Sequence, residues 1–557
     1  MLNNSDNKTD LAATSALALL CSLFLWHSYQ FWHYLNDDAY ITIRYATNLA
    51  SGIGPYFNPG EHVEGYSNTL QMLAIAAISF VFGHAAAPTG AKLISVSFGV
   101  LAIVFLFALV RRLLSDRLSR PSANLWALLA ASMLAVNPNF AVNSTSGLET
   151  TMFAALMIMA AWLADLETRA HRYLGSGLLF ALLVLCRPEG VLLFAVFWIT
   201  GAVLAMADRD DPKLKRKLLL LLANGITVGT VLIASVAVRY FIYDGELLPN
   251  TYFAKAGGFW GPALPYVASG LGPSLAKGVL LLIAIAAIVK WADFKRVAPL
   301  MVMATVAAAL PLVVGSDWMP GYRFVVHALP VVIAVTIYGI AHAVRALPVN
   351  SHLSPYTGFA VVLSLTAGLW WLESSQRQYL IGETTLRAGG YEQGHSALAQ
   401  HICSGPSAPS IALMDIGLIS HICRKSEIID ITGLTDRFIA KSEGRFLDKR
   451  YDPSYVLDRR PDYVVTVLTI PRQEGEPPPA ADAGWSFWTR AELNIYRHPD
   501  FREKYLRPAD EPIGDTPTPP EFLPLVERLG AEYLFESADV GVYYVMAVFR
   551  RRAEVEN

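Results

Sequence analysis

Two adjacent aspartates, Asp37 and Asp38, have the placement in this sequence that most strongly indicates chemistry. They follow the first long apolar segment, so both carboxylates are expected where a lipid bilayer meets water. A carboxylate loses hydration as the dielectric constant falls, and two neighbouring carboxylates repel each other, so this placement costs free energy. The cost favours a functional role, with one carboxylate acting as a general base or a nucleophile. The structural alternative is that one of them caps the helix expected at 39–49.

Other polar segments contain side chains that suit the binding of a sugar phosphate. Cationic side chains can hold a phosphate as it leaves, and Arg can do so through two parallel hydrogen bonds. The candidates for the phosphate are Arg44, Arg187, Lys255 and Arg323. Polar and aromatic side chains can bind sugar hydroxyls, and the candidates for the sugar or the acceptor are Glu64, Tyr66, Asn68, Glu149, Glu189, Asn250, Tyr252, Asp317 and Trp318.

Several candidates also have a structural interpretation, which the sequence leaves open. Glu149 can cap the helix that follows it, and Lys255 can extend to lipid headgroups. Local ion pairs are the alternative for four others, namely Arg187 with Glu189 and Asp317 with Arg323. Three residues nearer the C-terminus are interpreted as turn and cap residues rather than acceptor contacts: Asp430, Thr435 and Asp436.

The composition indicates an integral membrane protein. Apolar residues make up 54% of the 557 residues and charged residues only 16%. The mean hydropathy of +0.39 is far too high for a soluble chain of this length. A net charge of −2 excludes a strongly basic nucleic-acid-binding protein. We find no nucleotide-binding loop and no metal-ligand spacing among the histidines, so no cofactor is predicted, although a divalent cation held by carboxylates stays open.

The chain divides into an apolar part, 1–373, and a polar part, 374–557. Runs of roughly 17 to 25 apolar residues can cross a bilayer. We count about eleven such spans, near 11–34, 91–113, 125–137, 150–164, 174–186, 191–206, 218–241, 275–289, 297–314, 324–344 and 356–372. The short run 71–82 is interpreted as interfacial or re-entrant, because the Arg- and Lys-rich loops then all lie inside. The polar segments described above then share the outer face.

Residues 374–557 are typical of a soluble domain. Short apolar runs at 410–414, 427–431, 463–468 and 540–549 predict strands, with helices between them, and therefore one α/β domain. An odd number of spans with the N-terminus inside places this domain in the periplasm. Cys403 and Cys423 fall in it. They can form a disulfide in an oxidising compartment or stay as free thiols, and the sequence leaves both open.

The ordered motifs resemble those of the GT-C superfamily of membrane glycosyltransferases. More narrowly, they resemble the terminal β-(1→2)-arabinofuranosyltransferases of mycobacteria and their relatives. The resemblance rests on Asp-Asp-Ala-Tyr-Ile at 37–41 and Asn-Pro-Gly-Glu-His-Val-Glu-Gly-Tyr-Ser-Asn at 58–68, with further matches at 146–150, 187–190, 249–255, 315–323 and 430–436. It implies a GT-C fold with outer-face juxtamembrane helices and a catalytic aspartate in the first outer loop, here Asp37 or Asp38. It also implies decaprenyl-phosphoryl arabinofuranose, or a shorter polyprenyl analogue, as the donor.

We therefore expect a multi-pass enzyme of the bacterial cytoplasmic membrane that transfers an arabinofuranosyl residue at the outer face. An activated sugar must arrive there on a lipid, because nucleotide sugars are cytoplasmic. The acceptor stays open among a cell-envelope glycan, lipopolysaccharide and a protein. Transfer of mannose or aminoarabinose and protein O-glycosylation are alternatives. A lipid-linked sugar flippase is a further one, although such proteins more often show internal repeats, and we find none here.

Overall fold

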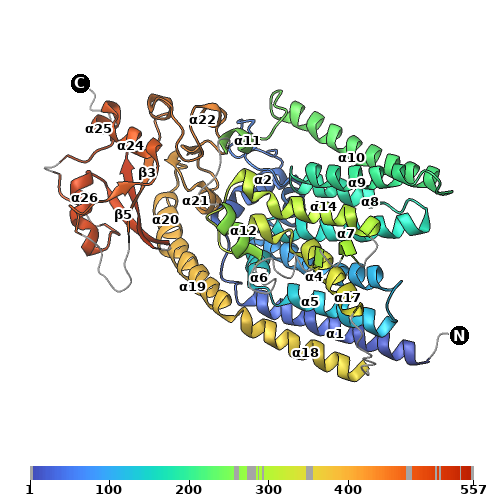
Figure 1. The fold of residues 1–557 in the computed structure, drawn as a ribbon. Coiled ribbons are helices and arrows are strands. Elements are labelled where there is room, and N and C mark those ends of the chain that lie inside the picture. The colour runs from blue at the N-terminus through green and yellow to red at the C-terminus, as the bar shows by residue number, and fades with distance from the viewer. Residues whose placement is uncertain are drawn as a thin grey trace.

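The structure is a computed structural model in which a helical bundle carries a smaller α/β region at one end (Figure 1). The residues that it describes are 4–255, 263–271, 284–285, 288–290, 294–346, 355–471, 480–508, 511–513, 516–539 and 541–552.

Six helical stretches among the described residues are long and apolar enough to cross a membrane. They are α1 (Asn4–Tyr29), α4 (Ala87–Leu114), α7 (Thr150–Ala170), α9 (Gly190–Ala207), α10 (Leu214–Ile242), and α14 (Phe294–Ala309) with α15 (Pro311–Val314). A seventh arises if α5 (Arg120–Ala135) and α6 (Pro138–Thr145), which are bent by 59°, count as one span. Shorter apolar helices are α3 (Thr69–Phe82), α8 (Ser176–Cys186), α17 (Leu329–Arg345) and α18 (Pro355–Leu372). The chain is thus a multi-pass membrane protein.

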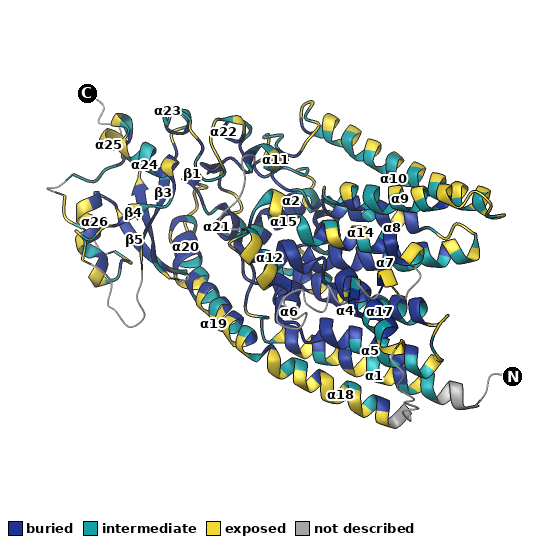
Figure 2. Ribbon diagram, viewed as in Figure 1, coloured by how far each residue is buried: buried dark blue, intermediate teal, exposed yellow. Residues whose placement is uncertain are grey.

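The positions of these helices follow the apolar runs of the sequence. The predicted span at 275–289 lies largely outside the described residues, so the number of eleven stays a prediction. The centre of the bundle is formed by α4 and α7, which Figure 2 shows as mainly buried. On α9 and α10, by contrast, Leu192, Val203, Leu219 and Ile233 point outward and are exposed. Apolar side chains on an outer surface fit contact with lipid rather than water.

Short helices lie between the bundle and the α/β region. They are α2 (Asp37–Ala50), η1 (His84–Ala86), α11 (Asn250–Ala254), α12 (Ala263–Leu271) and α16 (Arg323–Val326). The run interpreted as re-entrant, 71–82, is α3, a helix of 14 residues. It packs against α2, which in turn packs against the α/β region. These connections carry most of the polar motifs of the sequence.

The C-terminal region is built around one mixed sheet with strand order β2-β1-β3-β6-β5, and β4 pairs with β3. The four predicted strands are confirmed as β1 (Ile411–Leu413), β2 (Ile428–Asp430), β3 (Tyr463–Pro471) and β6 (Val542–Arg550). The sequence interpretation missed β4 (Ser486–Phe487) and β5 (Tyr533–Asp539). The parallel strands are β2, β1 and β3, whereas β6 runs antiparallel to β3 and to β5.

The helices of this region connect and cover the strands. Figure 1 shows α19 continuing from α18 toward the sheet. The elements are α19 (Ser374–Gly390), η3 (Tyr391–Ser396), α20 (Ala397–Cys403), α21 (Ile416–Ile422), α22 (Arg437–Lys441), α23 (Ser454–Leu457), α24 (Arg490–Arg497), α25 (Pro499–Lys504), η4 (Pro520–Phe522) and α26 (Leu523–Leu529). Of these, α21 packs directly on α2 of the bundle.

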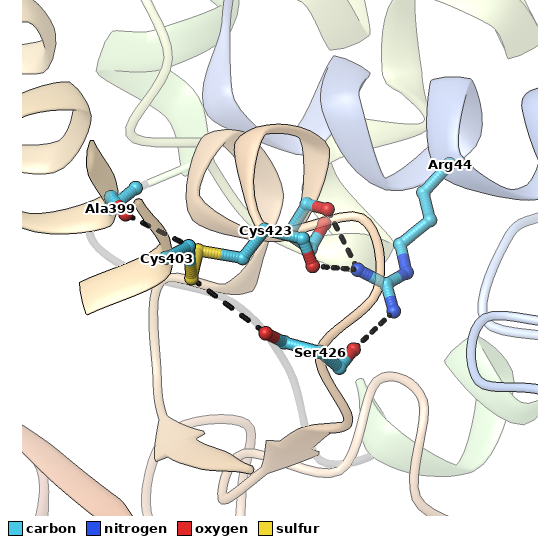
Figure 3. The surroundings of a disulfide bond; sticks show 6 residues. Arg44, Ala399, Cys403, Cys423 and Ser426 are labelled. Atoms are coloured by element: carbon cyan, nitrogen blue, oxygen red, sulfur yellow. Dashed lines mark hydrogen bonds between the residues drawn. A yellow bond between two sulfur atoms is a disulfide. The ribbon is translucent and has the colours of Figure 1, made fainter. Parts of the chain in front are cut away.

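A buried arginine, Arg44 on α2, joins the two parts of the molecule (Figure 3). Its Nη1 donates to the carbonyl of Ser420 at 2.7 Å, and its Nη2 donates to the carbonyl of Ser426 at 2.9 Å. Its Nε donates to the carbonyl of Phe57 at 2.8 Å. The carbonyls of Ser420 and Ser426 flank Cys423, which forms a disulfide with Cys403, so the pairing that the sequence left open is present. The disulfide therefore braces the loop that receives Arg44.

Replacing Arg44 by Leu should destabilise the junction, because several buried carbonyls lose their donor. Hydrogen bonds to charged groups contribute about 1.5–3 kcal/mol each, so we expect the free energy of unfolding to fall by about 3 kcal/mol. The measurement is thermal unfolding of the purified protein in detergent, combined with limited proteolysis. Arg502→Leu, at an exposed position on α25, is the matched control. Equal melting temperatures for the two variants would contradict this role of Arg44.

Candidate active site

A cavity of about 230 Å³ lies where the bundle meets the C-terminal region, and both parts line it. From the bundle side come Asp37, Asp38, Ile41, Lys255, Asp317, Trp318 and Arg323. From the C-terminal side come Arg387, Tyr391, His395, Met414, Asp415, Ile416, Thr432, Leu434, Phe446, Leu447, Trp488, Ser537, Asp539 and Tyr544. The cavity is thus an interface between segments that are far apart in the chain.

Asp37 uses both carboxylate oxygens to hold α21. Its Oδ2 accepts a hydrogen bond from the amide of Gly417 at 3.1 Å, and its Oδ1 accepts one from Leu418 at 2.7 Å. A Cβ atom at Gly417 would collide with the backbone carbonyl and the carboxylate of Asp37, so only glycine permits this approach. The cap of α2 itself is Asn36, whose side chain accepts from the amide of Asp38. Burial raises the pKa of Asp37, and the charge of His395 opposes the rise.

Asp38 is placed differently from its neighbour. It lines the cavity, and no described residue donates a hydrogen bond to its carboxylate. Burial raises the pKa of Asp38, and the positive charges of Lys255 and Arg323 oppose that rise. The carboxylate of Asp38 therefore faces the cavity beside two cations.

The two cations come from separate elements. Lys255 ends α11 and lies 5.6 Å from the centre of the Phe446 ring. Burial lowers the pKa of Lys255, which the charge of Asp38 opposes. Arg323 begins α16, and its Nε forms an ion pair with Asp317. The local pair between Asp317 and Arg323 that the sequence left open is therefore present, and it lies on the cavity wall.

The C-terminal wall contains ionisable residues that the sequence analysis did not identify. Asp415 accepts hydrogen bonds from His395 Nε2 at 3.1 Å and from the hydroxyl of Tyr544. Burial alone would lower the pKa of His395, but its hydrogen bond to Asp415 raises it. Arg387 pairs with Asp539 at 2.8 Å. The one usable signal was the position of Asp415 directly after a predicted strand, because side chains at the carboxyl ends of parallel strands often form sites.

A second group of candidates forms a buried ion network away from the cavity lining. Arg187 pairs with Glu149 at 2.6 Å and with Glu189 at 2.8 Å. Asn68 donates to Glu149 at 3.0 Å. Glu149 does begin α7, but its side chain makes no capping hydrogen bond there. These four side chains contact one another, and none of them lines the cavity.

The remaining candidates lie outside the cavity lining, with the exception of Trp318, and most of them are bound to other parts of the protein. Glu64 pairs with Arg239, and the hydroxyl of Tyr66 lies 3.0 Å from that of Tyr243. Asn250 donates to the carbonyls of Gly433 and Leu434, each at 2.9 Å. Arg44 is bound to backbone carbonyls, as described above, and Tyr252 is exposed. Asp430 accepts hydrogen bonds from Thr432, Gly433 and Thr435, and Asp436 caps α22.

No metal site is evident in the part of the chain that the structure describes. Within these residues, no group of three or more His, Cys, Asp or Glu side chains could hold a metal ion.

Comparison with known proteins gives partial matches to the sequence. A family described as a domain of unknown function, DUF8728, matches residues 380–508. The terminal beta-(1->2)-arabinofuranosyltransferase of Mycobacterium tuberculosis is 31% identical over 261 residues, which is 44% of this chain and 39% of the relative. The enzyme of the same name from Corynebacterium glutamicum is 24% identical over 363 residues, which is 59% of this chain and 51% of the relative. The chain thus spans about half or less of the length of these relatives.

Similar solved structures show the fold. Apo ArnT from Cupriavidus metallidurans aligns with a TM-score of 0.52 at 14% identity, covering 82% of this chain and 93% of ArnT. The structure of that protein bound to undecaprenyl phosphate aligns with a TM-score of 0.49 at 14% identity, covering 74% and 85%. The likeness of the apo structure shows that this chain shares the fold of ArnT.

The two aspartates should differ in their effect on stability. Asp37→Asn places an amide against the backbone N–H of Gly417 or Leu418, and we expect a loss of about 1–3 kcal/mol. Asp38→Asn removes a desolvated charge with no donor among the described residues, so the free energy of unfolding should stay the same or rise. Thermal unfolding of both variants measures the difference. A larger loss in Asp38→Asn than in Asp37→Asn would reverse the assignment.

Proposed function

We propose that this protein is a membrane glycosyltransferase that moves an arabinofuranosyl residue from a polyprenyl phosphate to a cell-envelope glycan or glycoconjugate. The observation that carries the proposal is the open carboxylate of Asp38 beside Lys255 and Arg323, in a cavity at the end of a bundle of apolar helices. The partial similarity to two terminal arabinofuranosyltransferases supports the choice of sugar.

The cavity has the charges that a lipid-linked sugar phosphate requires. Lys255 and Arg323 can hold the phosphate, while the polyprenyl chain extends along the apolar outer surface of the bundle. Asp38 lies close enough to both cations for their charges to lower its pKa. A phosphate bound by these cations would therefore place the anomeric carbon of the sugar near the carboxylate of Asp38.

The proposed reaction balances without a cofactor. The bond between the anomeric carbon and the phosphate oxygen breaks, and its electron pair leaves with polyprenyl phosphate. A bond forms between the anomeric carbon and the acceptor oxygen, while Asp38 takes the proton of that hydroxyl. The transition state resembles an oxocarbenium ion, which a nearby carboxylate stabilises. A pKa raised by burial brings Asp38 closer to the value that suits a general base.

Asp37 is proposed as a positioning residue in this scheme. Each of its oxygens accepts a hydrogen bond from an amide of α21, so its carboxylate holds α21 against α2. The resemblance to GT-C enzymes implied one catalytic aspartate in this motif, and the contacts favour Asp38.

The proposed location of the site is the outer face of the bacterial cytoplasmic membrane. The distribution of Lys and Arg supports it, because the basic loops then lie inside. The disulfide between Cys403 and Cys423 supports it as well, since disulfides persist in oxidising compartments. The C-terminal region would then lie in the periplasm with the cavity beneath it.

The decisive experiment measures transfer from synthetic polyprenyl-phosphoryl arabinofuranose to arabinofuranosyl oligosaccharides by the purified protein. We expect Asp38→Asn to lower kcat by about 10²–10⁴-fold, the usual contribution of a general base. Asp500→Asn, an exposed aspartate in the C-terminal region, is the control and should be fully active. Transfer from polyprenyl-phosphoryl mannose but not from the arabinose donor would overturn the choice of sugar, and an unaltered rate in Asp38→Asn would remove its role.

Lys255→Gln should weaken binding of the donor phosphate. Loss of one charge-assisted hydrogen bond of about 1.5 kcal/mol corresponds to roughly a tenfold rise in the dissociation constant. The probe is polyprenyl phosphate itself, with binding followed by calorimetry in detergent. Lys425→Gln, at an exposed position of the C-terminal region, is the control. Equal affinities in the two variants would argue against phosphate binding by Lys255.

A further inference from the structure

We infer that Asp415 binds a hydroxyl of the acceptor sugar through its Oδ1, and that His395 and Tyr544 hold its carboxylate in position. The inference rests on the proposed function, because it identifies the second substrate's site within the same cavity.

The hydrogen bonds of Asp415 are all on one oxygen. His395 Nε2 and the hydroxyl of Tyr544 both donate to Oδ2. Asp415 is the N-cap residue that precedes α21, but its side chain makes no capping hydrogen bond there. Among the described residues, none donates to Oδ1, and the side chain is 24% exposed on the cavity wall. One carboxylate oxygen is therefore available to a ligand while the other is fixed.

The groups behind Asp415 fix the direction of that free oxygen. The His395 side chain is only 3% exposed, and its Nδ1 lies 3.4 Å from Oγ of Ser537. Ser537 in turn donates to the carbonyl of Gly390 at 2.9 Å. A chain of hydrogen bonds thus runs from the backbone of α19 through Ser537 and His395 to Asp415. Such a chain holds a ligand-binding side chain in one orientation.

A purely structural carboxylate in this protein looks different. Asp37 receives an amide on each oxygen, and Asp430 receives donors on both of its oxygens. Both are buried and both join backbone segments. Asp415 has two strong donors on Oδ2 and an open Oδ1 facing the cavity, which is the arrangement of a preorganised binding group.

The carboxylate of Asp415 suits an acceptor hydroxyl better than the donor phosphate. A hydroxyl can donate a hydrogen bond to a carboxylate oxygen, whereas a phosphate held by Lys255 and Arg323 on the bundle side offers acceptor oxygens. Trp488 also lines the cavity, and its ring lies 6.2 Å from that of Tyr544. Aromatic faces with a few convergent polar groups suit a sugar ring. The C-terminal wall therefore has the chemistry of a neutral sugar site.

The position of Asp415 also suits the reaction. The charge of Asp415 raises the pKa of Asp38, so the two carboxylates lie within electrostatic reach of each other. An acceptor sugar held by Oδ1 of Asp415 through one hydroxyl would present a neighbouring hydroxyl to Asp38. Asp38 takes the proton of the attacking hydroxyl, and Asp415 keeps the ring in place.

The test compares two substrates in Asp415→Asn of the full-length protein. We expect the KM for an arabinofuranosyl oligosaccharide to rise about tenfold, while the KM for the polyprenyl-phosphoryl donor and the hydrolysis of donor to free arabinose stay unchanged. Tyr544→Phe, which keeps the ring and removes one donor to Oδ2, should give a smaller rise in the same constant. His395→Gln, which retains an N–H donor, should be less impaired than His395→Ala. Asp500→Asn is the matched control.

Direct binding separates this inference from the proposed function. Saturation-transfer NMR with the oligosaccharide and calorimetry with polyprenyl phosphate require no turnover. Weaker glycan binding with unaltered polyprenyl phosphate binding in Asp415→Asn and Tyr544→Phe supports the inference even if the donor sugar is not arabinose. A rise in donor KM alone would assign Asp415 to the donor and overturn it. Unaltered binding of both probes would show that the pair with His395 only supports the fold.

Discussion

The contact of the Asp37 carboxylate with the amides of Gly417 and Leu418 is the interaction on which the rest of the site depends. The first amides of a helix have no partner within the helix, and a buried carboxylate needs donors, so each side satisfies the other. The contact also fixes the positions of two residues close to it in sequence. Asp38 follows Asp37 in the chain, and Asp415 lies two residues before Gly417. One joint therefore places both open carboxylates on facing walls of the cavity.

The two parts of the cavity are chemically distinct. The bundle contributes Lys255 and Arg323 beside Asp38, whereas the C-terminal region contributes Asp415, His395 and aromatic rings. Arg44 and the disulfide hold these walls together outside the cavity. The buried guanidinium of Arg44 donates five hydrogen bonds to backbone carbonyls and to the side-chain oxygen of Asn58. Polar groups that look alike in sequence thus divide into those that build the joint and those that face the cavity.

Much of the fold could be predicted from the sequence, because continuous apolar segments indicate helices and strands that are buried in the protein or in the membrane. β3 and β6 are buried along most of their length, and both appeared as continuous apolar segments. β5 did not, since Glu536 and Ser537 interrupt its apolar pattern. In the site, the motifs located Asp37, Asp38, Lys255 and Arg323. They could not separate Asp37 from Asp38, because the partner amides lie 380 and 381 residues away. Nor could they show that Glu64, in the loop before α3, is bound by Arg239 of α10.

Asp37 and the amides that it binds, those of Gly417 and Leu418, are far apart in the sequence, and this separation has a consequence for biosynthesis. Until residue 418 has been synthesised and brought to the bundle, Asp37 has no amides to bind and the cavity has only one wall. A chain that stops after the bundle would carry Asp38 and its cations without the opposing wall that encloses them. Synthesis of the C-terminal region, and not insertion of the helices alone, is therefore the step that creates the two-walled cavity. A partly made chain in the membrane lacks the wall that carries Asp415.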